Sequence, residues 1–348
     1  MTKIDSSFKV KGLHLKNRIV MAPMCQYSVD KEDGIPNDWH LVHYVSRAVG
    51  GTGLIIMEMT SVTPEGRITN QDLGLWDDAQ VPAYKRIVSE VHKYGSKIGI
   101  QIAHAGRKAE NAMQPVGPST IQGEVLPEET KNGTLKLPRA LTIQEIKQTI
   151  EQFKNAARRA VEAGFDTIEL HGAHGYLLHQ FMSPNINNRT DEYGQDLSKF
   201  GVEVIRTVKS VMPDEMPLIM RISAIEYIDG GYGLEHSLQM AEKFKLAGID
   251  IFHVSSGGEG KPGSLKPGNY PGYQVPFIRA FKEKFEIPVI AVGMLSNPQV
   301  AEATLSNNDA DLIAVARGML NDPYWSLHAI KEITGKVTPP FQYGRGIR

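Results

Sequence analysis

The sequence predicts an α/β fold, a (β/α)₈ or TIM barrel, which begins with a short hairpin. Eight short apolar runs alternate with longer segments of helical pattern. Within each run, consecutive positions are apolar, which is typical of parallel strands that are covered on both faces. Polar and glycine-rich residues follow several runs directly, at the end of the barrel where active sites form. We therefore expect residues 1–348 to form one barrel domain with insertions.

The expected elements begin with a hairpin of Phe8–Val10 and Leu13–Leu15, which flank Gly12 and could plug the barrel bottom. A doubly wound sheet is the alternative, but no Gly-x-Gly-x-x-Gly motif follows the first strand. The eight strands are expected at Arg18–Ala22, Leu54–Met59, Lys97–Ala103, Thr167–Leu170, Leu218–Ile222, Ile251–Val254, Val289–Val292 and Leu312–Ala314.

Capping residues mark several helix ends. Thr142 followed by Glu145 is a capping box at the start of a long helix, and Gly164 is the expected end. Gly95 and Gly248 end helices in the same way, each just before a strand.

Two long loops follow expected strands. Asn111–Arg139 follows the third strand and Ser255–Tyr273 follows the sixth, so both lie on the active-site face of a barrel. We expect walls or lids over the site; surface decoration is the alternative.

Charge and cysteine content exclude several classes of protein. The net charge of −1 gives no overall field toward nucleic acid or an anionic membrane. The single cysteine, Cys25, excludes an internal disulfide and any site that needs four cysteines. Met1–Val10 is too polar for a signal peptide, and no apolar run is long enough to cross a bilayer. We expect a cytoplasmic protein with no nucleic-acid or membrane partner.

Glycine-rich segments after the last two strands predict a phosphate site. Gly293 follows the seventh strand, and Ala316 and Arg317 follow the eighth, which is the usual place for phosphate in this fold. An ion pair of Arg317 with Asp322 is the alternative. Arg221 ends the fifth strand, where an unpaired guanidinium is costly unless it meets an anion.

The fourth strand runs into His171-Gly-Ala-His174-Gly-Tyr176. Two imidazole N–H groups aimed at one oxygen form a clamp for an anion or a carbonyl, and Tyr176 offers a proton. The histidines could instead be metal ligands, but no third ligand is apparent in the motif. His171 could also be a core histidine. We expect no metal.

Five motifs stand in a fixed order along the chain: Leu15–Met24, Gln101–Arg107, His171–Tyr176, Phe181–Pro184 and Asn188–Gly194. In this order they resemble the Old Yellow Enzyme family, and the resemblance runs from about Phe8 to Arg345. Cys25 and Tyr27 make the chain similar to the thermophilic-like branch of that family. One stretch departs from the pattern, because the family's Asn-Arg pair is missing after Tyr193-Gly194; we expect this to affect the loop more than the chemistry.

The resemblance implies FMN as the cofactor, with a role for Cys25 in tuning it. A thiol near the flavin is a weaker donor than a hydroxyl and would shift the flavin potential; a buried apolar cysteine is the alternative. It implies Gln101 at the flavin pyrimidine edge, Arg221 near N1 and Arg317 on the phosphate. The full set of implied flavin contacts is Ala22, Pro23, Met24, Cys25, Met59, Gln101, Arg221, Gly293, Ala316 and Arg317.

The resemblance also implies an ene reductase with NADPH dehydrogenase activity. NADPH or NADH would reduce the flavin, which would pass a hydride to the activated C=C bond of an α,β-unsaturated carbonyl or nitro compound. His171 and His174 would bind the substrate oxygen, Tyr27 would help to position it, and Tyr176 would protonate the other carbon. The alternatives are a non-redox lyase or isomerase for a phosphorylated substrate and a non-catalytic FMN-binding protein.

The C-terminal segment, about residues 338–348, is expected to be an interface tail. Two prolines at its start break a helix, and aromatic and arginine residues follow. The resemblance implies a homodimer or homotetramer in which Arg345 reaches the active site of the neighbouring subunit. A disordered terminus is the alternative, and we expect Arg348 to be frayed.

Overall fold

A closed parallel barrel forms the centre of the molecule. The computed structural model describes residues 2–123 and 135–346. In that part of the chain the strands follow the order β3-β13-β12-β11-β10-β9-β6-β4, and β4 pairs with β3 to close the ring. The predicted barrel is therefore confirmed, and the doubly wound alternative is wrong. Its strands are β3 (Ile19–Met21), β4 (Leu54–Ser61), β6 (Lys97–Ala103), β9 (Thr167–Gly172), β10 (Leu218–Ser223), β11 (Ile251–Ser255), β12 (Val289–Ala291) and β13 (Leu312–Val315).

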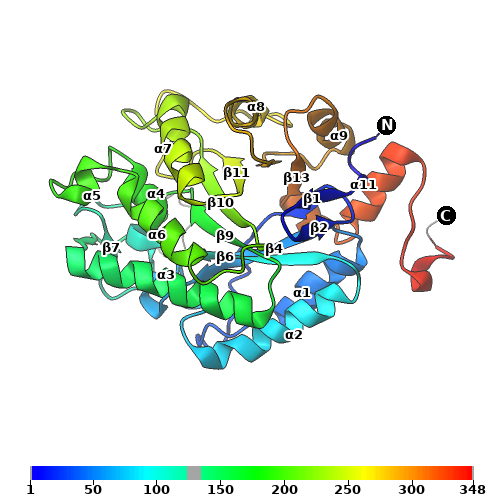
Figure 1. Ribbon diagram of the computed structural model, residues 1–348, viewed down its shortest axis with the longest axis horizontal. Helices are drawn as coiled ribbons and strands as arrows, with labels where there is room; N and C mark the ends of the chain where they lie inside the picture. The colour runs from blue at the N-terminus through cyan, green and yellow to red at the C-terminus, as the bar shows by residue number, and fades with distance from the viewer. Residues whose placement is uncertain (1, 124–134, 347–348) are drawn as a thin grey trace.

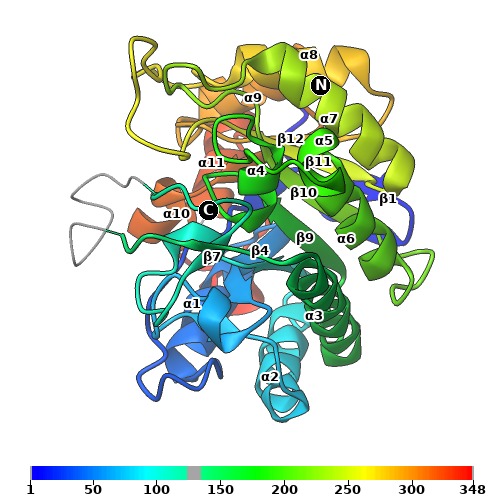
Figure 2. The same ribbon diagram turned by 90° about the vertical axis from the view of Figure 1, so that its left-hand side faces the viewer.

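Helices cover the outside of the barrel (Figures 1 and 2). Neighbouring helices in the ring pack on one another, for example α2 against both α1 and α3. No helix in the described ranges is long and apolar enough to cross a bilayer. The longer helices are α1 (Asp38–Val49), α2 (Val81–His92), α3 (Ile143–Ala163), α6 (Lys199–Lys209), α7 (Leu234–Ala247), α8 (Val275–Lys284), α9 (Pro298–Ser306) and α11 (Trp325–Thr334). Shorter ones are α4 (Leu177–Met182), α5 (Glu192–Gln195) and α10 (Arg317–Asn321).

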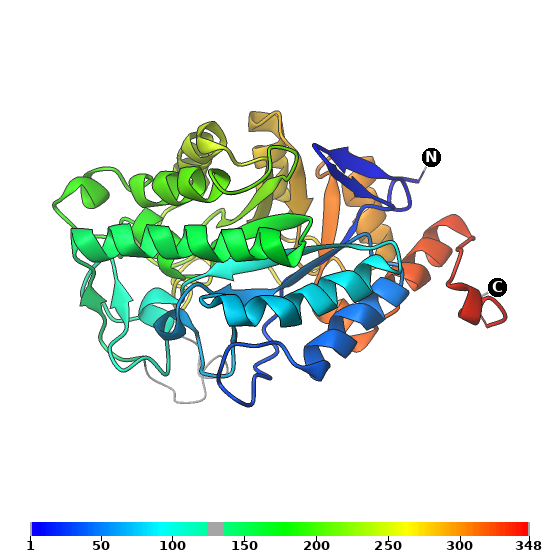
Figure 3. The same ribbon diagram turned by 60° about the horizontal axis from the view of Figure 1, so that its bottom comes forward.

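The N-terminal hairpin closes one end of the barrel, as predicted. β1 (Phe8–Val10) pairs antiparallel with β2 (Leu13–Leu15). Leu13 and Leu15 are buried against inward-facing residues of the strands, such as Val20 and Ile219. The hairpin lies at the opposite end of the molecule from α4, which follows the carboxyl end of β9 (Figures 1 and 3). Since all the strands run parallel, the end near α4 is open to carry a site.

The predicted helix ends are present. In α3 the Thr142 side chain accepts a hydrogen bond from the Glu145 amide, and the Glu145 side chain accepts from the Thr142 amide. The helix ends at Gly164, whose φ of 88° lies in the left-handed region that glycine adopts without strain. The helix therefore begins and ends where local sequence requires.

The two long loops meet at their bases. Lys108 Nζ, just beyond β6, donates to the Gly258 carbonyl beyond β11, and Arg107 pairs with Glu259. The first loop also contains β7 (Val116–Gly117), which pairs with β8 (Arg139–Ala140). Residues 124–134 of that loop lie outside the described residues, and so does Arg348.

Candidate active site

The turn after β9 brings His171, His174 and Tyr176 together. The ring centroid of His171 lies 5.1 Å from that of His174 and 4.9 Å from that of Tyr176, both in edge-to-face geometry. The backbone turns sharply here, with φ of 61° at His174 and 76° at Gly175. A Cβ at Gly175 would lie 2.7 Å from the Gly258 carbonyl oxygen, so only glycine fits.

Each of these histidines has one ring nitrogen bound to the protein. His171 Nδ1 accepts from the Ala173 amide at 3.4 Å, and His174 Nε2 lies 2.8 Å from Ser255 Oγ. Burial and the positive charge of Arg221 hold the pKa of both imidazoles well below the usual value, so both are neutral at pH 7. His171 Nε2 and His174 Nδ1 have no hydrogen-bond partner within residues 2–123 and 135–346 and are left for a ligand.

A buried set of polar side chains holds this turn from behind. The Gly175 amide donates to His179 Nδ1 at 2.9 Å, and Gln180 Nε2 donates to the Gly175 carbonyl at 2.7 Å. Lys108 Nζ donates to the His174 carbonyl at 3.0 Å. The unusual backbone of the turn is therefore fixed by direct hydrogen bonds.

His179 also belongs to a fully buried group with Glu226 and Glu259, whose geometry could hold a metal ion. His179 Nδ1, however, already accepts from Gly175, and Nε2 lies 2.9 Å from the Tyr232 hydroxyl. Arg107 neutralises Glu259. We therefore assign this group a supporting role; His171 and His174, which we considered as metal ligands, are not part of it.

A cavity of about 570 Å³ lies at the carboxyl ends of β10 to β13. It brings together four predicted phosphate and flavin residues: Arg221, Gly293, Ala316 and Arg317. The alternative ion pair of Arg317 with Asp322 is wrong, because Asp322 pairs with His328 at 2.6 Å. Arg317 is exposed at the rim of the cavity.

Arg221 gives this cavity a buried positive charge. Its side chain is 8% exposed, and its Nε has no hydrogen-bond partner in the described chain. Burial lowers the pKa of the guanidinium, but arginine stays charged at physiological pH. A buried cation with an unused donor costs free energy of desolvation unless an anionic or electron-rich group accepts from it. The site therefore fits such a group.

The first barrel strand leads into the same region. The Ala22 amide donates to the Val315 carbonyl at 3.0 Å, which places the segment Pro23–Cys25 beside the end of β13. Cys25 is half-buried and packs in a small apolar cluster with Met59 and Tyr176. Burial, with Asp72 and Glu58 nearby, raises the Cys25 pKa well above its usual value, so Cys25 is a neutral thiol.

Of the remaining predicted site residues, Tyr27 is 40% exposed and has a φ of 50°. Gln101 is buried inside the barrel, where its Nε2 donates to Glu169 Oε1 at 2.7 Å. Glu169 Oε2 in turn accepts from His253 Nδ1 at 2.7 Å. The amide of Gln101 is thereby oriented, and its carbonyl oxygen points away from Glu169 as an acceptor.

Arg345 lies elsewhere. It is exposed in the tail, whose short helical turn at Phe341–Tyr343 lies toward the same end of the molecule as the hairpin β1–β2, away from α4 (Figures 1 and 3). The tail touches the barrel helices through the Tyr343 hydroxyl, 3.2 Å from that of Tyr324. The structure therefore does not bring Arg345 to the active site of its own chain.

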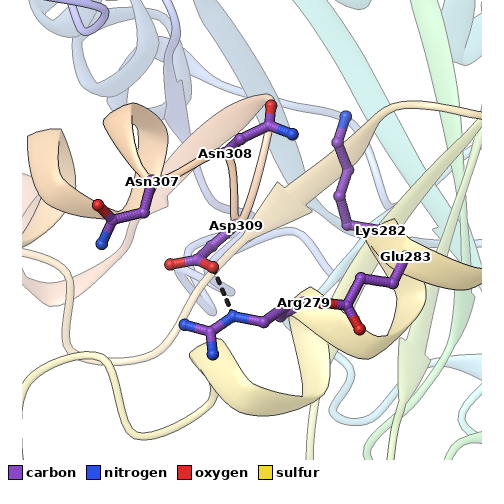
Figure 4. Close-up of a pocket in the computed structure, with 6 residues that line it drawn as sticks. All are labelled: Arg279, Lys282, Glu283, Asn307, Asn308 and Asp309. Atoms are coloured by element: carbon purple, nitrogen blue, oxygen red, sulfur yellow. Dashed lines mark hydrogen bonds and ion pairs between the residues drawn. The ribbon is translucent and has the colours of Figure 1, made fainter.

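A second hollow, of about 390 Å³, lies between the end of α8 and the start of β13 (Figure 4). Arg279 pairs there with Asp309 at 2.6 Å, and Lys282 pairs with Asp311. It faces the amino-terminal ends of the strands, and the two basic residues that line it, Arg279 and Lys282, are already paired. We therefore place the candidate active site at the opposite end of the barrel.

Comparison with known proteins identifies the chain. The profile of the NADH:flavin oxidoreductase / NADH oxidase family matches residues 5–335. The chain belongs to this family. This flavin oxidoreductase is 45% identical to an NADPH dehydrogenase of Listeria monocytogenes serotype 4a, with 99% of each chain covered. It is 44% identical to an NADPH dehydrogenase of Bacillus velezensis, covering 99% of this chain and 98% of the other.

Solved structures agree with this assignment. Morphinone reductase superimposes with a TM-score of 0.79 at 28% identity, covering 97% of this chain and 91% of the other. The structure of TcOYE with pHBA shares the fold, with a TM-score of 0.81 at 22% identity and coverage of 95% and 93%. The resemblance to the Old Yellow Enzyme family is confirmed, and the non-redox lyase or isomerase alternative is wrong.

Family membership gives the oxidoreductase FMN as its cofactor and a reduced nicotinamide as its reductant. The residues present fit this group. The partly unsatisfied guanidinium of Arg221 suits an electron-rich ring edge, and Arg317 on the cavity rim suits a phosphate. Gly293, with a φ of 121°, allows the backbone to approach closely.

Sequence reasoning missed several residues of this site. Ser255 and Gln274 line the cavity, and Lys108, His179 and Glu169 support the site from behind. Ser255 could have been found, because it is a polar residue at the carboxyl end of a strand. The others have no local signal, because their role depends on partners far along the chain.

Glu58 is a fully buried carboxyl group beneath the segment that carries Cys25. Its Oε2 accepts from the Gln26 amide at 2.7 Å, and its Oε1 accepts from the Tyr44 hydroxyl at 2.7 Å. Burial raises its pKa from 4.5 to about 8. Between pH 4.5 and about pH 8 the folded protein holds a proton on Glu58 that the unfolded chain releases. The free energy of unfolding therefore falls as the pH rises through this range.

Wild type should therefore lose stability between pH 6 and pH 9, and Glu58→Gln should lose less, because glutamine does not titrate. We expect the difference in melting temperature, variant minus wild type, to be larger at pH 9 than at pH 6. Thermal unfolding of both proteins across this range measures it. Glu286→Gln, a change at an exposed position, should show no such trend. Parallel curves for wild type and Glu58→Gln would contradict the assignment.

Proposed function

We propose that this flavin oxidoreductase is an ene reductase, which reduces the activated C=C bond of α,β-unsaturated carbonyl or nitro compounds with NADPH or NADH. The convergence of two neutral imidazoles and a tyrosine beside the Arg221 cavity supports this assignment. When bound, FMN would supply the hydride chemistry that links the nicotinamide to the β-carbon of the substrate.

His171 and His174 hold the substrate oxygen. Each offers the ring nitrogen that the protein leaves unused, Nε2 of His171 and Nδ1 of His174. Hydrogen bonds to this oxygen draw electrons from the double bond and stabilise the negative charge that develops on the oxygen. Each such donor in a pre-organised site is worth about 3–4 kcal/mol in the transition state.

Tyr176 donates the proton that completes the reduction, to the α-carbon and from the face opposite the hydride. Its ring packs against His171, and Lys108 Nζ lies 5.9 Å from the ring centroid. These contacts limit where the hydroxyl can lie, which is what a proton donor to carbon requires. Tyr27, at the rim, helps to position the substrate.

The remaining predicted residues hold FMN. Arg221 would stabilise negative charge on the reduced ring, and the oriented carbonyl of Gln101 would accept a hydrogen bond from its pyrimidine edge. Cys25, as a neutral thiol, would tune the potential of the flavin. Arg317, Gly293 and Ala316 would bind the phosphate, while Ala22, Pro23, Met24 and Met59 would line the ring.

The tail completes the site in a second subunit of a homodimer or homotetramer. Phe341 is 95% exposed, and the tail that carries the exposed Arg345 lies toward the end of the molecule away from α4. A phenylalanine this exposed gains by burial against another chain, at about 25 cal/mol for each Å². Arg345 would then lie near the partner's flavin or substrate.

The clamp is tested by His171→Ala combined with His174→Ala. We expect FMN content to stay unchanged while the affinity for 4-hydroxybenzaldehyde, a phenol that presents one oxygen, falls by about a hundredfold or more, since two donors are lost. Titration of the flavin absorption band measures this affinity. Unchanged affinity in the double variant would remove the clamp role.

Tyr176→Phe separates the two half-reactions. We expect reduction of the flavin by NADPH to keep its rate, because this step needs no proton from Tyr176, and oxidation by an enone to slow by about 10²–10⁴-fold. Stopped-flow measurement of each half-reaction under anaerobic conditions gives both rates. If flavin reduction slows instead, Tyr176 is not the proton donor.

The tail is tested by truncation after Pro340 and by Arg345→Ala. Truncation should lower activity and weaken self-association, and Arg345→Ala should raise the KM for substrate without lowering the melting temperature. Analytical ultracentrifugation and steady-state kinetics measure the two effects. A fully active monomer after truncation would defeat the proposal and leave the flavin assignment intact.

A further inference from the structure

For the two clamp histidines, His171 and His174, the position of the single ring proton decides whether each can donate to the substrate. A neutral imidazole carries one N–H, so one ring nitrogen is a donor and the other an acceptor. Burial beside Arg221 lowers the pKa of both rings well below the usual value, so neither is doubly protonated at pH 7. A clamp of two donors therefore requires the correct tautomer in each ring.

The backbone fixes the tautomer of His171. The Ala173 amide can only donate, so His171 Nδ1 accepts from it at 3.4 Å and the proton lies on Nε2. His171 Nε2 is the nitrogen left for the ligand, and it is a donor.

His174 has the opposite arrangement, because its Nε2 is the engaged nitrogen and its Nδ1 is left for the ligand. Its partner is the hydroxyl of Ser255, which lies 2.8 Å away and could either donate or accept. If Ser255 accepted, the proton would lie on His174 Nε2. Nδ1 would then present a lone pair that repels an anionic oxygen.

The surroundings of Ser255 decide the direction. The other acceptor near its hydroxyl is Gln274 Oε1, which lies at 3.4 Å, against 2.8 Å for His174 Nε2. Gln274 Oε1 already accepts from Ser256 Oγ at 2.6 Å. The single proton of Ser255 therefore goes to His174 Nε2, the closer acceptor.

Ser255 is itself held firmly. It is the last residue of β11, aligned with Ser223 of β10, and its carbonyl accepts from the Ala224 amide at 2.8 Å. Its side chain is 5% exposed and lines the Arg221 cavity. Because β10 holds the backbone of Ser255 in place, the hydroxyl stays within reach of His174.

We propose that Ser255 is a positioning residue that sets the tautomer of His174, with the proton on Nδ1, so that both histidines offer an N–H to the substrate oxygen. This inference deepens the proposed function and rests on it for the role of the clamp. The tautomer itself is a property of the protein and can be measured without a substrate.

The test uses the FMN-bound enzyme labelled with ¹⁵N-histidine. The ¹⁵N shifts of an imidazole separate a protonated from an unprotonated nitrogen, and the signals of His174 are those missing from His174→Gln. The variants are Ser255→Ala, which removes the hydroxyl, and Ser255→Thr, which keeps it. Ser264→Ala is the control, because Ser264 follows the same strand but is exposed and bonds Asp229, with no contact to Gln274 or His174.

We expect wild type to carry the proton on Nδ1. Ser255→Ala should move it toward Nε2 and weaken 4-hydroxybenzaldehyde binding about tenfold, as the loss of one donor implies. Ser255→Thr should restore both properties, and Ser264→Ala should keep the wild-type tautomer. The FMN absorption band shows that each variant retains its cofactor.

Two results would overturn the proposal. The first is a wild-type spectrum with the proton on His174 Nε2, which needs no variant at all. The second is a Ser255→Ala protein whose tautomer and affinity both match wild type. A wild-type enzyme with the proton on Nδ1 that binds neither the phenol nor enones would instead defeat the proposed function and leave the assignment of Ser255 standing.

Discussion

The pairing of β3 with β13 is the contact on which the whole site depends. It aligns Val20 with Ala314 and Met21 with Val315, and so joins the first barrel strand to the last. Closure places the segment after β3 beside Ala316 and Arg317. Because every strand of the ring runs in the same direction, each carboxyl end opens on the same face. Residues from distant parts of the chain thereby surround one cavity.

The charged side chains buried around that cavity are tolerated because most of them have a hydrogen-bond or ion-pair partner. Glu169 accepts from Gln101 and His253, and Glu259 pairs with Arg107. Removing such groups from water without partners would cost several kcal/mol each. Among the groups that line the cavity, Arg221 keeps a donor unused. The polar groups behind the site are thus held by hydrogen bonds and ion pairs, while Arg221 keeps a donor for a bound cofactor.

The same burial controls the chemistry of the side chains. It keeps His171 and His174 neutral and Cys25 a thiol, because each charged form is disfavoured in a low-dielectric environment. For a neutral imidazole, hydrogen bonding decides which nitrogen donates. The positions of Ala173 and Ser255 therefore matter as much as the histidines do, although neither side chain is titratable.

The sequence by itself determined the barrel, its hairpin and the ends of α3, because these depend on local apolar patterns and capping residues. It also placed the polar residues that follow the strands, since a parallel barrel collects them at one end. Only the tertiary structure decided their partners. Ser255 meets His174 across 81 positions of the chain, and Arg107 meets Glu259 across 152. Asp322 was the nearest carboxylate to Arg317 considered from the sequence, yet it pairs with His328. Strand register and side-chain direction fix such contacts, and neither follows from spacing along the chain.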